Sequence, residues 1–269
     1  MISFIGCGNM GEALLKGILE SSFLSSEQVT FYEKFASRRD YIAKTYGITP
    51  IGDICSSVKD SKYLLVAVKP QNIKQVIGEI GEFFRKDFNN IISIAAGIST
   101  EFYEKNLGEG TSVMRVMPNA PALYKKGIAA ISRGKYADDA DQEFTVELMR
   151  KIGDTILIRE DLQDISTAIN GSGPAYFFLF CKALIESATA NGLGKKAAKK
   201  LVIETMIGAG IMLKRSGLEI DELISKVASP GGTTEQALKS FKKSGLDDIV
   251  ENAVGDAVRR SKELGKQIL

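Results

Sequence analysis

Three glycines near the N-terminus are the first residues with a clear chemical use. They stand in the segment Gly6-Cys7-Gly8-Asn9-Met10-Gly11, which follows an apolar run and opens a stretch of helical pattern. Between a strand and a helix, this spacing allows a tight turn, close approach of the backbone to a pyrophosphate and close packing of the helix on a sheet. The segment therefore predicts a dinucleotide-binding loop. A glycine-rich turn that only packs is the alternative.

Charged residues at the end of the next apolar run concern the choice between NAD and NADP. An acidic residue there holds the ribose 2′-hydroxyl of NAD, whereas a basic residue favours the 2′-phosphate of NADP. The sequence places Glu33 and Lys34 at this point, followed by Arg38 and Arg39. Glu33 favours NADH and the basic residues favour NADPH, so the preference stays open. All four could also be solvated surface charges.

Three later loops follow predicted strands and could complete a cofactor site. They are Ala67-Val68-Lys69-Pro70, Ser93-Ile94-Ala95-Ala96-Gly97 and Met117-Pro118-Asn119-Ala120-Pro121. In an open α/β sheet, the loops at the carboxyl ends of the strands form the ligand crevice, and small residues such as Ala95, Ala96 and Gly97 leave room for a nicotinamide ring. Lys69 could be a catalytic or phosphate-facing cation, or only a solvated charge. Asn119 could bind the cofactor or its own turn.

Two glycine-containing segments stand out in the second half of the chain. Asn170-Gly171-Ser172-Gly173-Pro174-Ala175-Tyr176 places a proline at the start of an apolar helix. Ser229-Pro230-Gly231-Gly232-Thr233-Thr234 leads into another helical pattern, in which Thr233 and Gln236 match a capping box. Unpaired backbone N–H groups and the helix dipole at such a start also suit a carboxylate. A carboxylate pocket and a well-capped helix start are both consistent with these residues.

The elements that must position these residues change in type near residue 160. Short β-branched runs predict strands at Ile2–Ile5, Val29–Tyr32, Tyr63–Val68, Ile91–Ala95, Ser112–Met117, Ile128–Ser132 and Thr155–Ile158. Helical stretches lie between most of them, which predicts a mostly parallel sheet covered by helices. Further on, only helical patterns remain, roughly at 161–169, 174–191, 195–215, 219–228, 234–243 and 247–267. We expect an α/β dinucleotide-binding domain over residues 1–160 and an all-helical domain over residues 161–269.

The helical pattern over 195–215 is nearly all apolar through Ile207–Leu213, and such a helix must be buried. The helical half is small for a core of its own, so we expect this surface to pack against another subunit. The small residues Gly208, Ala209 and Gly210 would let helices approach closely. A central helix within one subunit is the alternative.

Composition excludes several classes of function. The 269 residues are 44% hydrophobic and 25% charged, as in a globular protein with a sizeable core, and the net charge of +2 argues against a nucleic-acid or membrane surface. Histidine is absent, which excludes imidazole bases and His-ligated metals, and we expect no metal site. Three cysteines without a C-x-x-C spacing fit a reducing cytoplasm. The N-terminus lacks the basic region of a secretory signal, and the longest uncharged run, Ile165–Cys181, falls short of a membrane span.

Taken in order over essentially the whole chain, these motifs resemble those of the pyrroline-5-carboxylate reductases. The loop at Gly6–Gly11 is generic, whereas the segment Ser229–Thr234 is similar to the signature of that family. The resemblance implies transfer of hydride from NADPH or NADH to the imine carbon of 1-pyrroline-5-carboxylate, which gives L-proline and ends proline biosynthesis. It also implies a Rossmann-type domain followed by a helical dimerisation domain that interlocks with a second subunit, often in rings of dimers.

The resemblance further implies roles for individual residues. Ser229 and the backbone of Gly231, Gly232, Thr233 and Thr234 would hold the substrate carboxylate, and the Thr234 hydroxyl would face the ring nitrogen. Glu160 matches an acid near the substrate in similar proteins. Because a protonated cyclic imine accepts hydride readily, such a site must orient the substrate rather than supply a strong base. Glu33 departs from the uncharged or Asn-Arg pair that these reductases often carry, as suits NADPH.

Two other functions deserve comparison. A β-hydroxyacid dehydrogenase would use a lysine in a G-x-G-x-x-x-K segment, but here Gly171-Ser172-Gly173 is followed by Phe177 at that place. A non-catalytic NAD(P)-binding scaffold would have no use for the Ser229–Thr234 segment. Both are therefore weaker interpretations than a reductase.

Overall fold

The computed structural model describes residues 1–266, and the contacts divide the chain into two compact units. The first unit contains Met1–Pro174 and the chain from Asp256 onward, and the second contains Ala175–Gly255. The segment 161–174 therefore belongs to the unit that contains the sheet, although the predicted strands end near residue 160 and only helical patterns follow. The cause is Gln163, which is fully buried and donates hydrogen bonds from Nε2 to the Ser132 hydroxyl at 2.8 Å and to the Ala130 carbonyl at 3.3 Å.

The first unit is built on a seven-stranded sheet in the order β2-β1-β3-β4-β5-β6-β7. The strands are β1 (Ile2–Ile5), β2 (Val29–Tyr32), β3 (Tyr63–Val66), β4 (Asn90–Ser93), β5 (Val113–Met117), β6 (Gly127–Arg133) and β7 (Gly153–Leu157). The first five run parallel, β6 is antiparallel to β5, and β7 is parallel to β6. The prediction of a mostly parallel sheet is confirmed. The carboxyl ends of β1 to β5 consequently meet at one edge.

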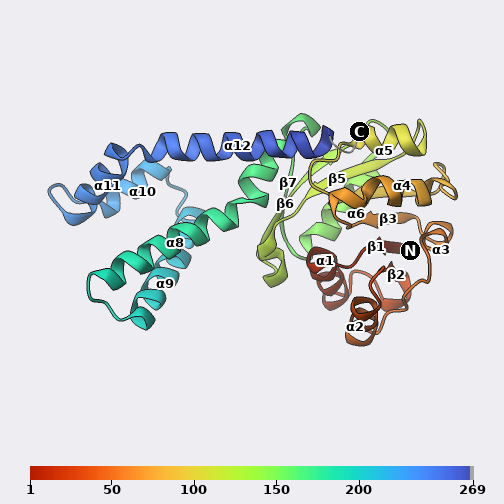
Figure 1. Ribbon diagram of the computed structural model, residues 1–269, viewed down its shortest axis with the longest axis horizontal. Coiled ribbons are helices and arrows are strands. Elements are labelled where there is room, and N and C mark those ends of the chain that lie inside the picture. The colour runs from red at the N-terminus through yellow and green to blue at the C-terminus, as the bar shows by residue number, and fades with distance from the viewer. Residues whose placement is uncertain (267–269) are drawn as a thin grey trace. The chain divides into compact units, whose positions relative to one another are not determined.

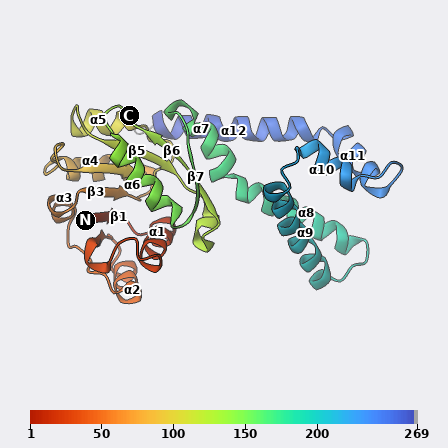
Figure 2. The ribbon, with the colours of Figure 1, turned by 180° about the vertical axis from the view of Figure 1, so that it is seen from behind.

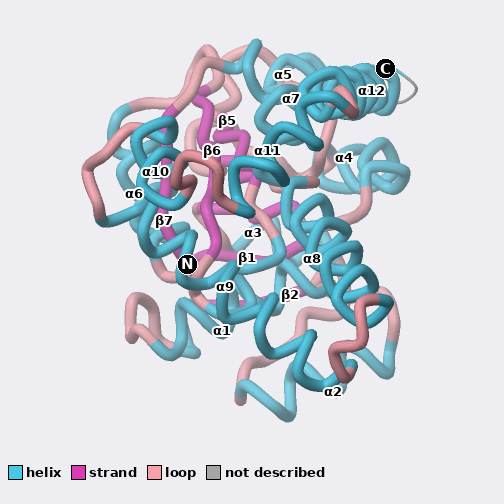
Figure 3. The backbone as a smooth tube through the Cα atoms, turned by 90° about the vertical axis from the view of Figure 1, so that its left-hand side faces the viewer, coloured by secondary structure: helices cyan, strands magenta, loops and turns pink. Residues whose placement is uncertain are grey.

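Helices cover both faces of this sheet, as the colours in Figure 2 trace along the chain. They are α1 (Asn9–Glu20), α2 (Ala36–Tyr46), α3 (Ile54–Asp60), α4 (Ile73–Gly81), α5 (Thr100–Leu107) and α6 (Asp139–Arg150). Apolar residues of α1, α2 and α6 form one buried cluster with the strands, and those of α3, α4 and α5 form another. Figure 3 shows the strands as a central layer with α4 and α6 on opposite sides. The fold is therefore a three-layer α/β sandwich.

The segment predicted as one helix over 161–169 is instead three short helical pieces. A 3-10 turn at Glu160–Leu162 leads into α7 (Gln163–Ser166), and a π-helical turn follows at Thr167–Gly171. The wide turn brings Asn170 against the end of β5, where its Nδ2 donates to the Met117 carbonyl at 2.8 Å. A Cβ at Gly171 would lie 2.5 Å from Cε of Met117, so the glycine permits this close packing.

The second unit is helical, as predicted. Its helices are α8 (Gly173–Ala190), α9 (Lys195–Arg215), α10 (Ile220–Val227), α11 (Thr233–Lys243) and α12 (Leu246–Lys266), coloured green to blue in Figure 1. The first two residues of α8, Gly173 and Pro174, and the part of α12 from Asp256 onward belong to the first unit. Residue 267, which was predicted to end the last helix, lies outside the described residues.

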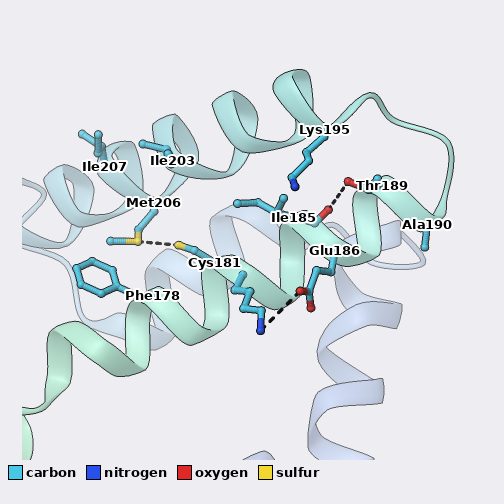
Figure 4. A pocket seen from close by; sticks show the side chains of 11 residues that line it. Phe178, Cys181, Ile185, Glu186, Thr189, Ala190, Lys195, Ile203, Met206 and Ile207 are labelled. Atoms are coloured by element: carbon cyan, nitrogen blue, oxygen red, sulfur yellow. Dashed lines mark hydrogen bonds and ion pairs between the residues drawn. The ribbon is translucent and has the colours of Figure 1, made fainter.

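Two of these helices leave most of their apolar side chains uncovered within the single chain. Phe177 of α8 is 61% exposed and Leu201 of α9 is 58% exposed, and of α9 only Ala198 is buried. A cavity of about 910 Å³ opens between the two helices, lined by Phe178, Cys181, Ile203 and Met206 among others (Figure 4). Since its apolar surface is open, α9 is not a central buried helix of one subunit. Within residues 1–266, no helix has both the length and the apolar character that crossing a membrane requires.

Candidate active site

The turn from β1 into α1 uses its three glycines in three different ways. Gly6 has a φ of +92°, and a Cβ there would lie 2.8 Å from Cγ1 of Val68. A Cβ at Gly11 would lie 3.0 Å from the carbonyl oxygen of Gly6. At Gly8 no other side chain or loop atom of the described residues lies within 4 Å of the corresponding position. The first and third glycines therefore permit a tight turn and close helix packing, while the second faces open space that a ligand can approach.

The same turn leaves the start of α1 without a side-chain cap. Gly8 is the N-cap residue, with extended backbone at φ −65° and ψ −171°, and no side chain accepts a hydrogen bond from the first turn. The N–H groups of a first helical turn have no acceptor within the helix, and the helix dipole adds positive potential. The open space at Gly8 thus fits a pyrophosphate group.

Glu33 ties this turn to the end of β2. Its side chain is 8% exposed, and its carboxylate accepts hydrogen bonds from the backbone N–H of Cys7 at 2.9 Å and of Phe35 at 3.1 Å. A carboxylate fixed at this point can also accept a ribose hydroxyl, and it repels a 2′-phosphate. The Glu33 carboxylate is therefore fixed in position before any cofactor binds.

The basic residues after β2 are arranged differently from one another. Arg38 donates to the Cys7 carbonyl at 2.8 Å and to the Glu12 carboxylate at 2.5 Å. Partial burial opposes ionisation of Glu12, but hydrogen bonds from Tyr46 and Arg38 outweigh it and hold the pKa of Glu12 below its ordinary value. The charged Glu12 carboxylate therefore holds the Arg38 guanidinium in an ion pair. Lys34, in contrast, is exposed.

The loops after β3 and β4 lie at the same edge of the sheet as the glycine turn. Lys69 is exposed and precedes a 3-10 turn at Pro70–Asn72. In the next loop, the N–H of Ala95 donates to the Ser93 hydroxyl at 3.3 Å, and that hydroxyl lies 2.6 Å from the Tyr103 hydroxyl. Gly97 follows with a φ of +78°. Side chains beneath the loop therefore fix its backbone.

Asn119 uses its side chain within the protein. It is 8% exposed, and its Oδ1 accepts the N–H of Ile128 at the start of β6 at 3.0 Å. This bond joins the loop after β5 to the neighbouring strand, rather than closing the turn of Asn119 itself. The amide therefore stiffens the loop.

Glu160 lies just after β7 in the first unit and pairs with Arg115 of β5. Its Oε1 accepts from Nη1 of Arg115 at 2.9 Å and from the Thr100 N–H at 3.1 Å, while its Oε2 is buried and has no hydrogen-bond partner among residues 1–266. The Arg115 side chain is only 7% exposed. Sequence reasoning missed Arg115, although a lone arginine in an otherwise apolar strand was the available signal. The pair joins β5 to the start of α5.

The glycine segment of the second unit precedes α11. That helix begins at Thr233 with Gly232 as its N-cap, and no side chain caps it, so the predicted capping box of Thr233 and Gln236 is wrong. With Thr233 as its N-cap, the helix would begin at Thr234, but it begins at Thr233. Instead, the Glu235 carboxylate accepts the N–H of Gly231 at 2.8 Å. Hydrogen bonds from Lys239 and then from this N–H keep the pKa of Glu235 below its ordinary value.

Two hydroxyl groups of this segment have different surroundings. Ser229 is exposed. Thr234 is half-buried and borders a cavity of about 340 Å³ in the second unit, whose other lining residues are apolar, among them Met212 and Leu223. In apolar surroundings a single hydroxyl can orient one polar atom of a ligand.

The Cys7 side chain of the glycine turn is a buried free thiol. Burial raises the pKa of the Cys7 thiol to about 12, so it stays protonated at neutral pH. Within residues 1–266, no three Cys, Asp or Glu side chains are grouped so that they could hold a metal ion.

The three roles of the glycines can be separated by substitution. Gly8→Asn keeps a favourable N-cap residue but fills the open space, so we expect the thermal unfolding temperature to stay within about 2 °C and NADH affinity to fall more than about tenfold. Gly11→Ala, which presses on the Gly6 carbonyl, should lower the unfolding temperature itself. Scanning calorimetry and NADH fluorescence titration measure the two effects. Unchanged NADH binding by Gly8→Asn would contradict the assignment.

Comparison with known proteins covers both halves of the chain. Residues 160–264 match the family model for pyrroline-5-carboxylate reductase dimerisation, and residues 1–97 match that for NADP oxidoreductase, coenzyme F420-dependent. The pyrroline-5-carboxylate reductase of Methanosarcina acetivorans is 36% identical, over 99% of this chain and 98% of its own.

Solved structures give the same result. A pyrroline-5-carboxylate reductase from Coxiella burnetii has a TM-score of 0.90 at 32% identity, over 98% of this chain and 97% of its own. The Plasmodium falciparum pyrroline carboxylate reductase, solved with NADP bound, has a TM-score of 0.88 at 30% identity and the same coverage. This chain belongs to the pyrroline-5-carboxylate reductase family.

Proposed function

We propose that this chain reduces 1-pyrroline-5-carboxylate to L-proline, the last step of proline biosynthesis, with NAD(P)H as the hydride donor. The observation that carries the proposal is the similarity to reductases over nearly the whole chain, including the Ser229–Thr234 segment. Hydride adds to the imine carbon, the carbon–nitrogen double bond becomes single, and the nitrogen keeps the proton that activated it. Such a reaction needs orientation of the substrate more than a strong base, which suits a chain without histidine.

The experiment that tests this function is a cofactor-oxidation assay. Purified protein mixed with NADH or NADPH should lower the reduced-cofactor absorbance only after 1-pyrroline-5-carboxylate is added. Proline should accumulate in equal amount. Cofactor binding without substrate-dependent oxidation would instead indicate a scaffold.

The dinucleotide site we propose is formed by the carboxyl edge of the sheet in the first unit. The turn Gly6–Gly11 holds the pyrophosphate, Glu33 and Lys34 flank the adenosine ribose, and the loops Ala67–Pro70 and Ala95–Gly97 receive the nicotinamide half. Bound NAD(P)H supplies the hydride. The open backbone at Gly8 supports this assignment, since a Cβ there meets no protein atom within 4 Å. Asn119 contributes indirectly, because its side-chain hydrogen bond with the Ile128 N–H fixes the loop after β5.

Cofactor choice follows from the charges around the ribose. Glu33 is held in place by two backbone N–H groups, and Arg38 is engaged by Glu12 and by the Cys7 carbonyl. A 2′-phosphate would thus meet a fixed negative charge, while the Arg38 guanidinium is already bound to Glu12 and to the Cys7 carbonyl. We infer that NADH is used at least as well as NADPH.

Glu33→Gln tests this inference, because it removes the charge and keeps one oxygen acceptor. We expect the ratio of kcat/KM for NADPH to that for NADH to rise at least about threefold, since a unit charge about 4 Å from a phosphate is worth roughly 1 kcal/mol even at the dielectric constant of water. Glu27→Gln, an exposed change in the same unit, is the control. A wild type that strongly prefers NADPH, together with an unchanged ratio in Glu33→Gln, would contradict the role of Glu33.

Substrate binding is assigned to the start of α11. The Ser229 hydroxyl and the backbone of Gly231 to Thr234 hold the substrate carboxylate, and the Thr234 hydroxyl faces the ring nitrogen. Within this turn the Gly231 N–H donates to the Glu235 carboxylate and the Gly232 N–H donates to the Ser229 carbonyl. The N–H groups of Thr233 and Thr234 therefore make the backbone hydrogen bonds to the substrate in this proposal. Glu160 is proposed to act near the substrate, through the pair that it forms with Arg115.

The hydroxyl of Thr234 can be tested by a pair of variants. Thr234→Ala should lower kcat by about 10- to 1,000-fold, or roughly 1.4–4 kcal/mol, and leave cofactor affinity nearly unchanged. Thr234→Ser keeps the hydroxyl and should recover much of the rate. Steady-state kinetics on both variants give the answer. Wild-type turnover in Thr234→Ala, or a serine variant as slow as alanine, would mean that this hydroxyl has no catalytic role.

The match to a dimerisation model implies a homo-oligomer. We propose that it is built from dimers in which a second copy covers the exposed apolar faces of α8 and α9.

The three cysteines are free thiols, which supports a reducing, cytoplasmic location.

Gly208 of α9 gives a direct test of the dimer. Among the described residues, a Cβ there meets no atom within 4 Å in the single chain, so a loss of association in Gly208→Leu would indicate that another copy lies against this face. We expect weaker association in sedimentation experiments, together with lower activity. Gly78→Leu on α4, where a Cβ also meets open space, is the matched control. An active wild-type monomer at micromolar concentration would contradict the proposed dimer.

A further inference from the structure

The loop between β4 and α5 packs against the last turns of α12, all within the first unit (Figures 1 and 2). A Cβ at Gly97 would lie 2.9 Å from the carbonyl oxygen of Ser261. A Cβ at Gly265 would overlap the carbonyl oxygen of Gly97. Two backbones meet here with no room for a side chain between them, so the position of the loop depends on the position of the helix end.

A chain of polar contacts joins the same helix end to the start of α5. The Ser261 hydroxyl donates to the Asp164 carboxylate at 2.7 Å, which lies 3.7 Å from Nη2 of Arg115. Nη1 of Arg115 donates to Glu160 at 2.9 Å, and the Thr100 N–H donates to the same Glu160 oxygen at 3.1 Å. A buried guanidinium between two carboxylates has a defined geometry, because its donors form a planar fork.

These contacts fix the loop at both ends and in the middle. The Ser93 hydroxyl holds the N–H of Ala95, α12 bounds Gly97, and Glu160 holds the N–H of Thr100. The loop is thus shaped by residues that come from well outside it in sequence. Its small residues face the cofactor in the function proposed above, on which the present inference rests.

We propose that the end of α12, through Ser261 and Gly265, positions the β4–α5 loop for binding of the nicotinamide half of NAD(P)H. Ser261 and Gly265 are positioning residues, because they act through the loop and through the Arg115–Glu160 pair. Since residues 246–255 of the same helix belong to the second unit, one continuous helix connects the dimerisation region to the cofactor loop.

Gly265→Ala tests the backbone contact, with Gly255→Ala on the same helix as its control. A Cβ at Gly255 meets no atom within 4 Å. We expect Gly265→Ala to raise the Kd of NADH, measured by fluorescence without substrate, about tenfold or more. The KM for NADH should rise in parallel, whereas the KM for 1-pyrroline-5-carboxylate should change less than about threefold. Gly255→Ala should match the wild type in the Kd of NADH and in both KM values. Sedimentation should show the same oligomer for the wild type and the two variants.

Ser261→Ala tests the polar chain and remains informative if Gly265→Ala does not fold. It should raise the Kd of NADH about threefold or more with little change in kcat. Wild-type NADH binding in folded Ser261→Ala, or in folded Gly265→Ala, would overturn the inference, even if the unfolding temperature fell. A wild type that binds neither NADH nor NADPH would overturn the proposed function as well. An active wild type with normal variants would overturn only the role of α12.

Discussion

The backbone of the turn after β1 must pass so close to the end of β3 that a side chain at Gly6 would collide with Val68. The rest of the first unit depends on this constraint. Because β1 lies between β2 and β3, the turn meets Glu33 from one side and the loop Ala67–Pro70 from the other. Gly11 then lets α1 start directly over the turn, and Gly8 is left open. A surface for an elongated, negatively charged ligand thus follows from three backbone positions.

Charged side chains fix the loops around that surface, and most of them are paired with the protein itself. Glu33 binds two backbone N–H groups, Glu12 holds Arg38, and Glu160 holds Arg115. Such pairs define geometry more than they stabilise the fold, because desolvation offsets much of their attraction. In this account, cofactor preference and loop position are both set by hydrogen bonds that exist before the ligand binds. That preorganisation lowers the cost of binding a flexible dinucleotide.

The sequence predicts the elements well and their side-chain contacts poorly. The residue pattern located the seven strands from short β-branched runs and the helices of the second unit from apolar residues three and four apart. It could not distinguish the 3-10, α and π turns after β7, whose form depends on Asn170 reaching β5. The capping box at Thr233 failed because the helix starts one residue earlier. The charge of Arg38 suggested that it could bind a phosphate, but tertiary packing places it in an ion pair with Glu12. The sequence analysis also missed Arg115, which lies inside an apolar strand and pairs with Glu160.

The central claim is that this chain passes hydride from NAD(P)H to the imine carbon of 1-pyrroline-5-carboxylate. The most direct measurement uses NADH and NADPH carrying deuterium at the transferable position of the nicotinamide ring, with 1-pyrroline-5-carboxylate as substrate. The account predicts proline with a single deuterium at carbon 5 and none elsewhere, seen by mass spectrometry and NMR. Proline without deuterium, or oxidised cofactor without proline, would contradict it.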